Sequence, residues 1–258
     1  MKIGFRTAGF SAWDLGPSLR AIRDAGYDSV ELCLEHPGSR PEMMDDVRVT
    51  RVLKMLEEIE LELSSVSYHG DGSPAAEREA KTLQAIEVAR KMGANVLVIN
   101  GDAKDPANPN QLAEFEQRLR CFCQTAEQHK IDLALEPEPN LLIESSADLE
   151  ALAARIGSPR IKMNIDVGHA FITDPDVVQT IRRMGNMIVH THVEDIAGKV
   201  HKHLLPGQGD IDLKAVFAAL REAGFTGSLT IDLFNLGDKP DEMARAAYDA
   251  LKKMMNDE

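Results

Sequence analysis

Four polar residues of the kinds that bind divalent cations follow apolar stretches in the second half of the chain. They are Glu136, Asp166, His192 and Asp232, and each stands at or near the end of a run typical of a β-strand: IDLALE (131–136), IKMNID (161–166), MIVHTH (187–192) and GSLTID (227–232). If these runs are successive parallel strands of a barrel, their carboxyl ends meet at one end of it. There, three carboxylates and one imidazole could hold a single divalent ion.

Short β-branched runs and amphipathic stretches alternate along the whole chain, which predicts parallel strands joined by right-handed helical crossovers. Further strands are expected at 2–6, 29–34, 63–68 and 95–100, and helices near 15–26, 43–59, 75–92, 109–129, 146–156, 174–184, 212–223 and 240–255. Eight such units without an intervening linker predict one (β/α)8 TIM-barrel domain over residues 1–258. An open doubly wound sheet is the alternative, but no GxGxxG motif follows the first strand.

Histidine usage adds to the four strand-end residues, because five of the eight histidines lie between residues 169 and 203. His190 and His192 alternate on one strand and therefore face the same side of the sheet. We favour His192 as the ligand, since it is nearer the strand end, and expect His190 to be an inner hydrogen-bonding residue. Gly168 is expected to let the backbone turn tightly after Asp166, so that His169 folds back over the same opening.

Each of these candidates also has a purely structural interpretation. Glu136 could pair with a neighbouring loop, and Asp166 could cap the helix that follows it. Asp232 could be a paired or surface carboxylate. A carboxylate at the end of an apolar strand is costly to bury unless it is paired, bound to a metal or open to a cleft.

A long segment separates the seventh strand from the next helix, and βα loops of this length are usually functional. It carries His201 and His203 before the turn-forming PGQG (206–209), and Asp210 or Asp212 is expected to cap the helix beyond. His69 follows the third strand. We expect these three histidines to be further candidates for contacts with a substrate.

The composition limits the partners. The 29 basic and 42 acidic residues give a net charge of −13, which argues against nucleic acid as the main partner. No stretch approaches the length of a membrane-spanning helix, and the N-terminus enters a strand-like run without a secretion signal. Three cysteines without CxxC spacing are typical of a reducing compartment. We therefore expect a cytoplasmic protein without a membrane partner.

Five segments resemble the xylose isomerase-like TIM barrels, also called the sugar phosphate isomerase/epimerase superfamily, which is related to AP endonuclease family 2 and, distantly, to endonuclease IV. The resemblance extends over essentially the whole chain. Its most specific parts are LALEPEP (133–139), NIDVGH (164–169), HTHVED (190–195), HKHLLPGQGDID (201–212) and LTID (229–232).

The resemblance implies one divalent metal ion, Mn²⁺, Mg²⁺, Co²⁺ or Zn²⁺, held by Glu136, Asp166, His192 and Asp232. It also implies that the end carboxylates, Glu136 and Asp232, are the acid/base pair, and that His169 contacts a substrate oxygen. Two features depart from the family pattern. The last ligand is an aspartate instead of the usual glutamate, and the loop carries Lys199, His201, Lys202 and His203 where epimerases often place an arginine.

The chemistry implied is removal of a proton next to a carbonyl, as in an isomerase or epimerase that acts on a keto-sugar or related polyol. A dehydratase or lyase for a keto-inositol or 3-keto-sugar would share this first step, with His201 or His203 as the acid. Phosphodiester hydrolysis as in endonuclease IV and a non-catalytic sugar-binding barrel are further alternatives. A small carbohydrate is the expected partner, and a homodimer is the expected assembly.

Overall fold

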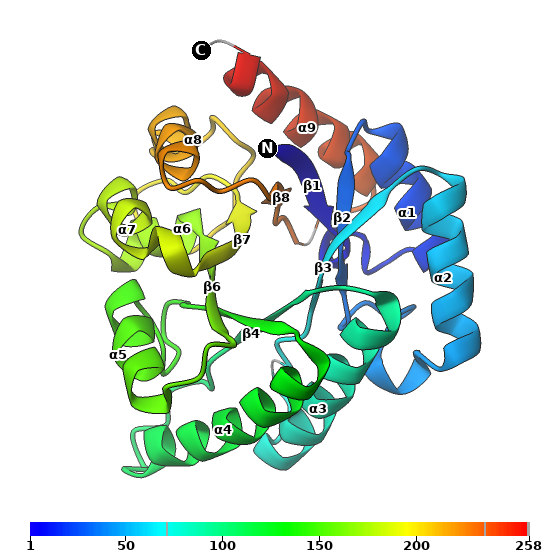
Figure 1. Cartoon of the computed structure of the whole chain (residues 1–258). Helices are drawn as coiled ribbons and strands as arrows, with labels where there is room; N and C mark the ends of the chain where they lie inside the picture. The colour runs from blue at the N-terminus through cyan, green and yellow to red at the C-terminus, as the bar shows by residue number, and fades with distance from the viewer. Residues whose placement is uncertain (71, 235, 257–258) are drawn as a thin grey trace.

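Eight parallel strands close into a barrel in the computed structural model, which describes residues 1–70, 72–234 and 236–256 (Figure 1). This confirms the predicted (β/α)8 fold. The strands are β1 Lys2–Arg6, β2 Ser29–Cys33, β3 Glu62–Ser67, β4 Val96–Asn100, β5 Asp132–Glu136, β6 Ile161–Asp166, β7 Ile188–Val193 and β8 Ser228–Ile231. Each pairs with its neighbours in the sequence, and β1 pairs with β8 to complete the ring.

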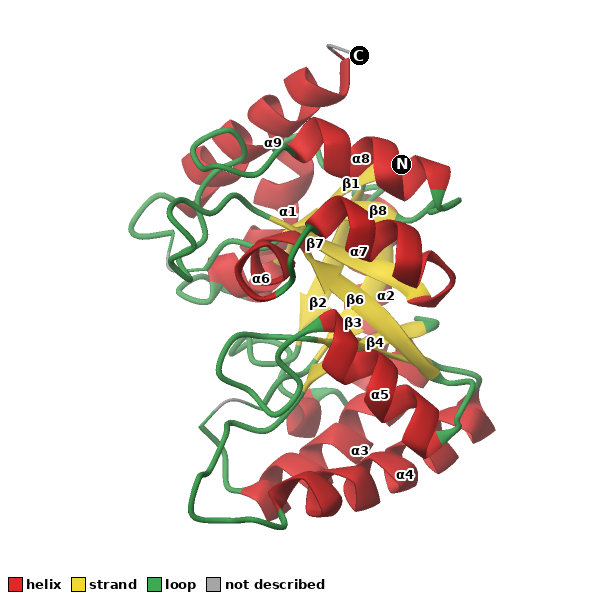
Figure 2. Ribbon diagram, turned by 90° about the vertical axis from the view of Figure 1, so that its left-hand side faces the viewer, coloured by secondary structure: helices red, strands yellow, loops and turns green. Residues whose placement is uncertain are grey.

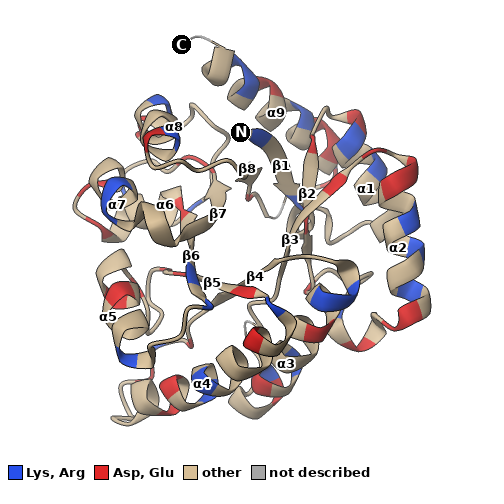
Figure 3. Cartoon of the chain, viewed as in Figure 1, with Lys and Arg blue, Asp and Glu red and all other residues tan. Residues whose placement is uncertain are grey.

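The helices lie outside the strands, and the loops that follow the strands gather on one side of the barrel (Figure 2). Acidic and basic residues are both spread over these outer helices (Figure 3). The helices are α1 Leu15–Asp24, α2 Asp46–Glu58, α3 Ala75–Met92, α4 Gln111–His129, α5 Ser146–Ile156, α6 Val167–Thr173, α7 Val177–Met184, α8 Leu213–Glu222 and α9 Pro240–Asn256. In the described ranges, three short 3₁₀ helices are Thr7–Phe10, Pro41–Met43 and Gly185–Met187. The short helix α6 was not predicted, because seven residues are too few for a clear helical period.

Helices α1 and α3 are each followed by a glycine before the next strand. Gly26 and Gly93 have φ values of +106° and +72°, in the region that favours glycine. Between the helices and the strands lies one continuous apolar core that includes Phe5, Tyr27 and Phe217. Within the described residues, no helix combines the length and apolar character needed to cross a membrane.

The strand register places the candidate residues at one level. Asp166 on β6 is directly opposite His192 on β7, and His192 is opposite Thr230, two residues before Asp232. On the other side, Glu136 on β5 pairs with Asn100 on β4. Since side chains alternate along a strand, this register directs the strand-end side chains towards the same opening.

Candidate active site

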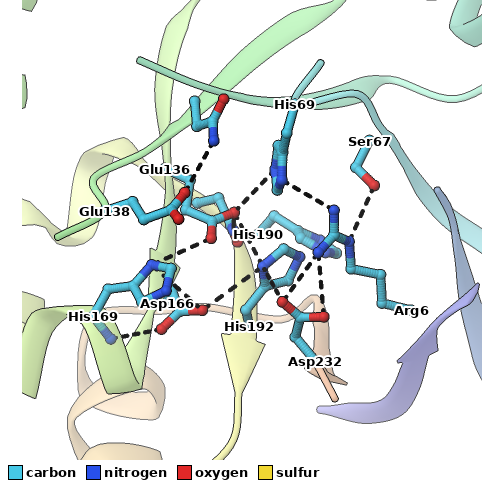
Figure 4. A network of polar contacts seen from close by, with 12 residues as sticks. Arg6, Ser67, His69, Glu136, Glu138, Asp166, His169, His190, His192 and Asp232 are labelled. Atoms are coloured by element: carbon cyan, nitrogen blue, oxygen red, sulfur yellow. Dashed lines mark hydrogen bonds and ion pairs between the residues drawn. The ribbon is translucent and has the colours of Figure 1, made fainter. Parts of the chain in front are cut away.

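The four residues predicted to act together lie close to one another, with the three carboxylates grouped around Nδ1 of His192 (Figure 4). Glu136 Oε2 lies 3.1 Å from this nitrogen, Asp232 Oδ2 3.7 Å and Asp166 Oδ2 4.0 Å. All four side chains are buried. Three buried carboxylates around one imidazole nitrogen need positive charge nearby, which a protonated imidazole or a bound cation can supply.

The donor atoms fit a divalent cation. Asp166 Oδ2 and His192 Nδ1 are buried and make no hydrogen bond within the described part of the chain. Glu136, Asp166 and His192 each offer a ligand atom within 4.8 Å of the other two. Carboxylate oxygens with one imidazole form a donor set suited to Mn²⁺, Mg²⁺ or Co²⁺, and also accepted by Zn²⁺.

Asp232 has a partner that sequence reasoning missed, Arg6 at the end of β1. Arg6 Nη1 donates to both Asp232 oxygens, at 3.1 Å and 3.3 Å, and Nη2 lies 3.0 Å from His69 Nδ1. Burial would raise the pKa of Asp232, but the charge of Arg6, assisted by His192, lowers it. The signal in the sequence was a charged residue at the end of the apolar run KIGFR (2–6), in the same strand position as the four candidates.

Sequence reasoning also missed Glu31 on β2, which contacts the His192 ring at Nε2, the nitrogen on the side away from the three carboxylates. Glu31 Oε2 lies 2.9 Å from His192 Nε2 and 2.6 Å from His190 Nε2, and its Oε1 lies 3.0 Å from Arg6 Nε. Burial would raise the pKa of Glu31, but His192 and His190 hold it well below its usual range. An ionised carboxylate only accepts hydrogen bonds, so His192 donates from Nε2. Burial lowers the pKa of His192, but Glu31 and Glu136 raise it well above its usual value. A metal ion at this position would take the place of the proton on Nδ1, which lies 3.1 Å from Glu136 Oε2.

His190 is the inner histidine that the strand alternation predicted. It lies one layer below His192, where its Nε2 contacts Glu31 and lies 3.2 Å from Ser65 Oγ. Its neighbours are buried, and it is not among the residues that line the cavity above. Its contacts explain its place in the fold without a role in binding.

Asp166 serves two purposes that the sequence interpretation had treated as alternatives. Its Oδ1 accepts a hydrogen bond from the His169 backbone at 2.7 Å and so caps α6, while its Oδ2 faces His192. His169 folds back over the opening as expected, with Nδ1 3.3 Å from Glu136 Oε1. Capping and site formation are compatible because the two carboxylate oxygens point in different directions.

The explanation offered for Gly168 was wrong. Its φ is not positive, and no tight turn requires glycine there. Its backbone N–H instead donates to Glu194 Oε1 at 2.7 Å, and a Cβ at this position would overlap that carboxylate. Burial, together with the charge of Asp166, raises the pKa of Glu194 well above its usual value. Glu194 was also missed, because a polar residue just beyond a strand usually faces solvent.

Above the four converging residues lies a cavity of about 280 Å³. The four histidines expected to contact a substrate, His69, His169, His201 and His203, all line it. His201 Nε2 lies 2.9 Å from His169 Nε2, and these rings with His203 form a compact imidazole cluster. The cluster lines the cavity with ring nitrogens that can donate to or accept from the hydroxyl groups of a bound molecule.

Glu35, Glu138 and Phe234 line the same cavity and were not among the predicted site residues. Burial and the nearby charge of Glu136 raise the pKa of Glu138, which accepts a hydrogen bond from Asn100 Nδ2 at 2.9 Å. Phe234 is exposed at the rim and its ring lies 4.7 Å from that of His203. An exposed aromatic ring at the mouth of a polar cavity suits the apolar face of a sugar.

The long loop after β7 is held in place by Asp195. Asp195 Oδ2 accepts from Gly207 N at 2.9 Å, and Oδ1 accepts from Ile196 N and Ile211 N. The loop thereby places His203, whose Nδ1 donates to the Asp232 carbonyl at 2.7 Å. Asp212 caps α8 through Ala215 N, as one of the two predicted possibilities.

Comparison of the sequence with known proteins identifies the family. The family model described as "Xylose isomerase-like TIM barrel" matches residues 19–254, so the chain belongs to that family. A fructoselysine 3-epimerase from Shigella flexneri is 22% identical over 272 residues, which cover 99% of this chain and 98% of the relative.

Two solved structures show the same fold. The probable 3-DHS dehydratase AsbF from Bacillus anthracis matches with a TM-score of 0.81 and 19% identity, over 98% of this chain and 99% of that one. An IOLI protein with a bound zinc atom matches with a TM-score of 0.79 and 18% identity, over 100% and 97% of the two chains. At these identities the matches establish the architecture, and chemistry must be argued from this chain's own side chains.

Proposed function

We propose that this protein is a divalent-metal-dependent isomerase or epimerase that acts on a keto-sugar or related polyol. The observation that carries the proposal is the convergence of Glu136, Asp166 and Asp232 on His192 Nδ1 beneath a cavity lined by imidazoles. The epimerase name of a relative that spans nearly the whole chain supports the reaction class.

The metal would be held by Glu136, Asp166 and His192, with Asp232 as the fourth ligand. When bound, such an ion supplies positive charge where negative charge develops on the carbonyl and neighbouring hydroxyl oxygens of the substrate. The zinc in a structural neighbour supports metal binding in this fold. In this chain, Arg6 already neutralises much of the Asp232 charge, so we expect Asp232 to be the weakest of the four ligands.

Glu136 is the proposed principal acid/base. Its Oε2 accepts a hydrogen bond from Asn164 Nδ2 at 2.9 Å, and the side chain lines the cavity floor. Burial would raise the pKa of Glu136, but His192 and His69 hold it well below its usual range, so the residue begins the reaction as a carboxylate. It takes the proton from the carbon next to the carbonyl, and the C–H electron pair moves into an enediolate. In an isomerisation, Glu136 returns the proton to the neighbouring carbon and the enediolate electron pair forms the new C–H bond. In an epimerisation, Asp232 would first have to take a proton from water and then deliver it to the opposite face of the same carbon.

The lyase alternative needs an acid for the leaving hydroxyl, and the two candidates suit this poorly. His203 Nδ1 donates its hydrogen to the Asp232 carbonyl at 2.7 Å, so the proton on this nitrogen is already engaged in a hydrogen bond within the protein. Burial and the neighbouring rings of His169 and His203 lower the pKa of His201, which favours its neutral form. Isomerisation, which needs no such acid, is therefore the reaction we favour.

Metal content tests the proposal directly. We expect about one divalent ion per chain after loading with Mn²⁺ or Zn²⁺, and a loss of most of it in Asp166→Ala, because Asp166 Oδ2 is a buried ligand candidate without a hydrogen-bond partner of its own among the described residues. In Asp232→Ala the loss should be smaller, since Arg6 competes for that carboxylate. Elemental analysis of the gel-filtered proteins measures both. A wild-type protein that binds no ion under either loading would contradict the proposed function, and about three zinc ions would favour phosphodiester chemistry.

Glu31→Gln is predicted to weaken metal binding by about 10- to 100-fold, the usual effect of removing the residue that orients a ligating histidine. The amide keeps the shape but replaces the charged acceptor for His192 Nε2 and His190 Nε2. Calorimetric titration with Mn²⁺ gives the dissociation constant. Glu62→Gln, an exposed glutamate on the adjacent strand β3, is the matched control and should bind as wild type does. Equal affinity in both variants would show that Glu31 has only a packing role.

A further inference from the structure

We infer that the substrate is an uncharged, non-phosphorylated ketose or keto-cyclitol of monosaccharide size. This inference rests on the proposed function and narrows it to one substrate class. It follows from three features of the described cavity: its charge, the occupation of its backbone donors, and its volume.

The cavity carries an excess of negative charge. Glu35, Glu136, Glu138 and Asp232 line it, with Asp166 directly behind them. Among the described lining residues Arg6 is the one permanent cation, and it is engaged with Asp232 and Glu31. None of the four residues outside the described ranges is a lysine or arginine. A bound divalent cation would still leave the carboxylates in excess, so a phosphate dianion would meet repulsion.

TIM barrels often bind phosphate with backbone N–H groups of the loops after strands 7 and 8. After β7, this chain fills that position with its own carboxylates. Asp195 takes the N–H groups of Ile196, Gly207 and Ile211. Asp210 accepts from Gly198 N at 2.7 Å. An incoming phosphate would have to displace a buried aspartate that is already hydrogen-bonded.

Two further termini that follow strands are already matched by acidic residues of the protein. Glu35 Oε1 accepts from His69 N at 2.6 Å and Gly70 N at 2.8 Å. After β8, helix α9 begins with Pro240, which has no N–H, and carries Asp241 and Glu242 in its first turn. These acids already complement the positive end of the helix dipole and would repel an anion there.

The remaining donors suit hydroxyl and carbonyl groups. The rings of His69, His169, His201 and His203 offer hydrogen-bonding nitrogens around the cavity, and Phe234 offers an apolar surface at its rim. The volume of about 280 Å³ falls at or below the small end of ligand pockets, which start near 300 Å³. A single sugar or cyclitol ring without a charged extension matches both the donors and the size.

The test compares each of three free ketoses with its own phosphate ester: D-fructose, D-tagatose and L-ribulose against fructose 6-phosphate, tagatose 6-phosphate and ribulose 5-phosphate. Calorimetric titration of the Mn²⁺-loaded protein gives dissociation constants, and NMR in D₂O follows deuterium uptake next to the carbonyl. For each pair in which binding is detected, we expect the unphosphorylated ketose to bind at least about tenfold more tightly than its phosphate ester. Inorganic phosphate should not raise the midpoint of thermal unfolding.

Glu35→Gln sharpens the comparison, because it keeps the shape of the side chain and removes one negative charge from the cavity wall. The ratio of the dissociation constants of the phosphate ester and the free ketose should fall by about threefold in this variant. That is the order of magnitude expected for the loss of one screened charge several ångströms away. Tighter binding of the phosphate esters, or an unchanged ratio in Glu35→Gln, would overturn the inference and leave the proposed function standing. Absence of binding and of deuterium uptake with all six compounds would instead overturn the proposed function.

Discussion

Replacement of Glu136 by glutamine should reduce turnover by at least about 10³-fold, within the range that a positioned acid/base residue contributes. Glutamine is nearly isosteric and still accepts a hydrogen bond from Asn164, but it cannot take a proton from carbon. Asp166 and His192 remain in place, so the variant should keep most of its metal at saturating Mn²⁺. Deuterium uptake into a free ketose measures the proton-transfer step, and elemental analysis measures the ion.

Glu144→Gln is the matched control for this experiment. Glu144 lies in the loop that follows the same strand, pairs with Lys104 and is not among the residues that line the cavity. Its replacement should leave both proton transfer and metal content unchanged. Near-normal deuterium uptake in Glu136→Gln, with Glu144→Gln unaffected, would exclude Glu136 as the acid/base residue and direct attention to Asp232 or Glu138.

The barrel and the four converging residues could be predicted because both depend on periodic sequence signals. Eight apolar runs separated by helical stretches allow few topologies, and a polar residue at the end of such a run stands out against it. Glu136, Asp166 and His192 could be grouped on this basis, and the structure brings them together. The strand register then supplies the common depth.

The supporting residues could not be predicted, because their partners are distant in the sequence. Glu31 lies within an apolar run like those that carry the candidates, but its partners His190 and His192 are about 160 residues further along the chain. Arg6 likewise pairs with Asp232 across the β1–β8 junction. Their positions on apolar strands are visible in the sequence, but their partners are defined only when the barrel closes.

Gly168 shows the same limit in a different form. A glycine after a strand end suggests backbone freedom, which is a local property, whereas the structure requires it for the close approach of Glu194 from the next strand. The sequence therefore indicates that residue 168 must be a glycine, but not why. The cause is a tertiary contact that only the assembled β6–β7 pair defines.

Replacement of Arg6 by methionine should destabilise the metal-free protein by about 3–5 kcal/mol, the usual result of removing one partner from a buried ionic network. Asp232 and Glu31 would both lose their guanidinium partner in a setting where neither carboxylate reaches water. Urea unfolding monitored by circular dichroism measures the change. Arg90→Met, which removes an exposed arginine paired with Glu87, is the control and should shift the urea midpoint far less than Arg6→Met does, because solvent screens that pair.

The same variant separates the two partners available to Asp232. In Arg6→Met the freed carboxylate can only be neutralised by a proton or by a metal ion, so saturating Mn²⁺ should stabilise this variant more than it stabilises the wild type. The double variant Arg6→Met/Asp232→Asn should lose that extra metal-dependent stabilisation and recover part of the metal-free stability, because one of the two unpaired charges is gone. Equal stabilisation of the wild type, the single variant and the double variant by Mn²⁺ would mean that Asp232 is not a metal ligand and only pairs with Arg6. Glu136, Asp166 and His192 would then hold the ion without it.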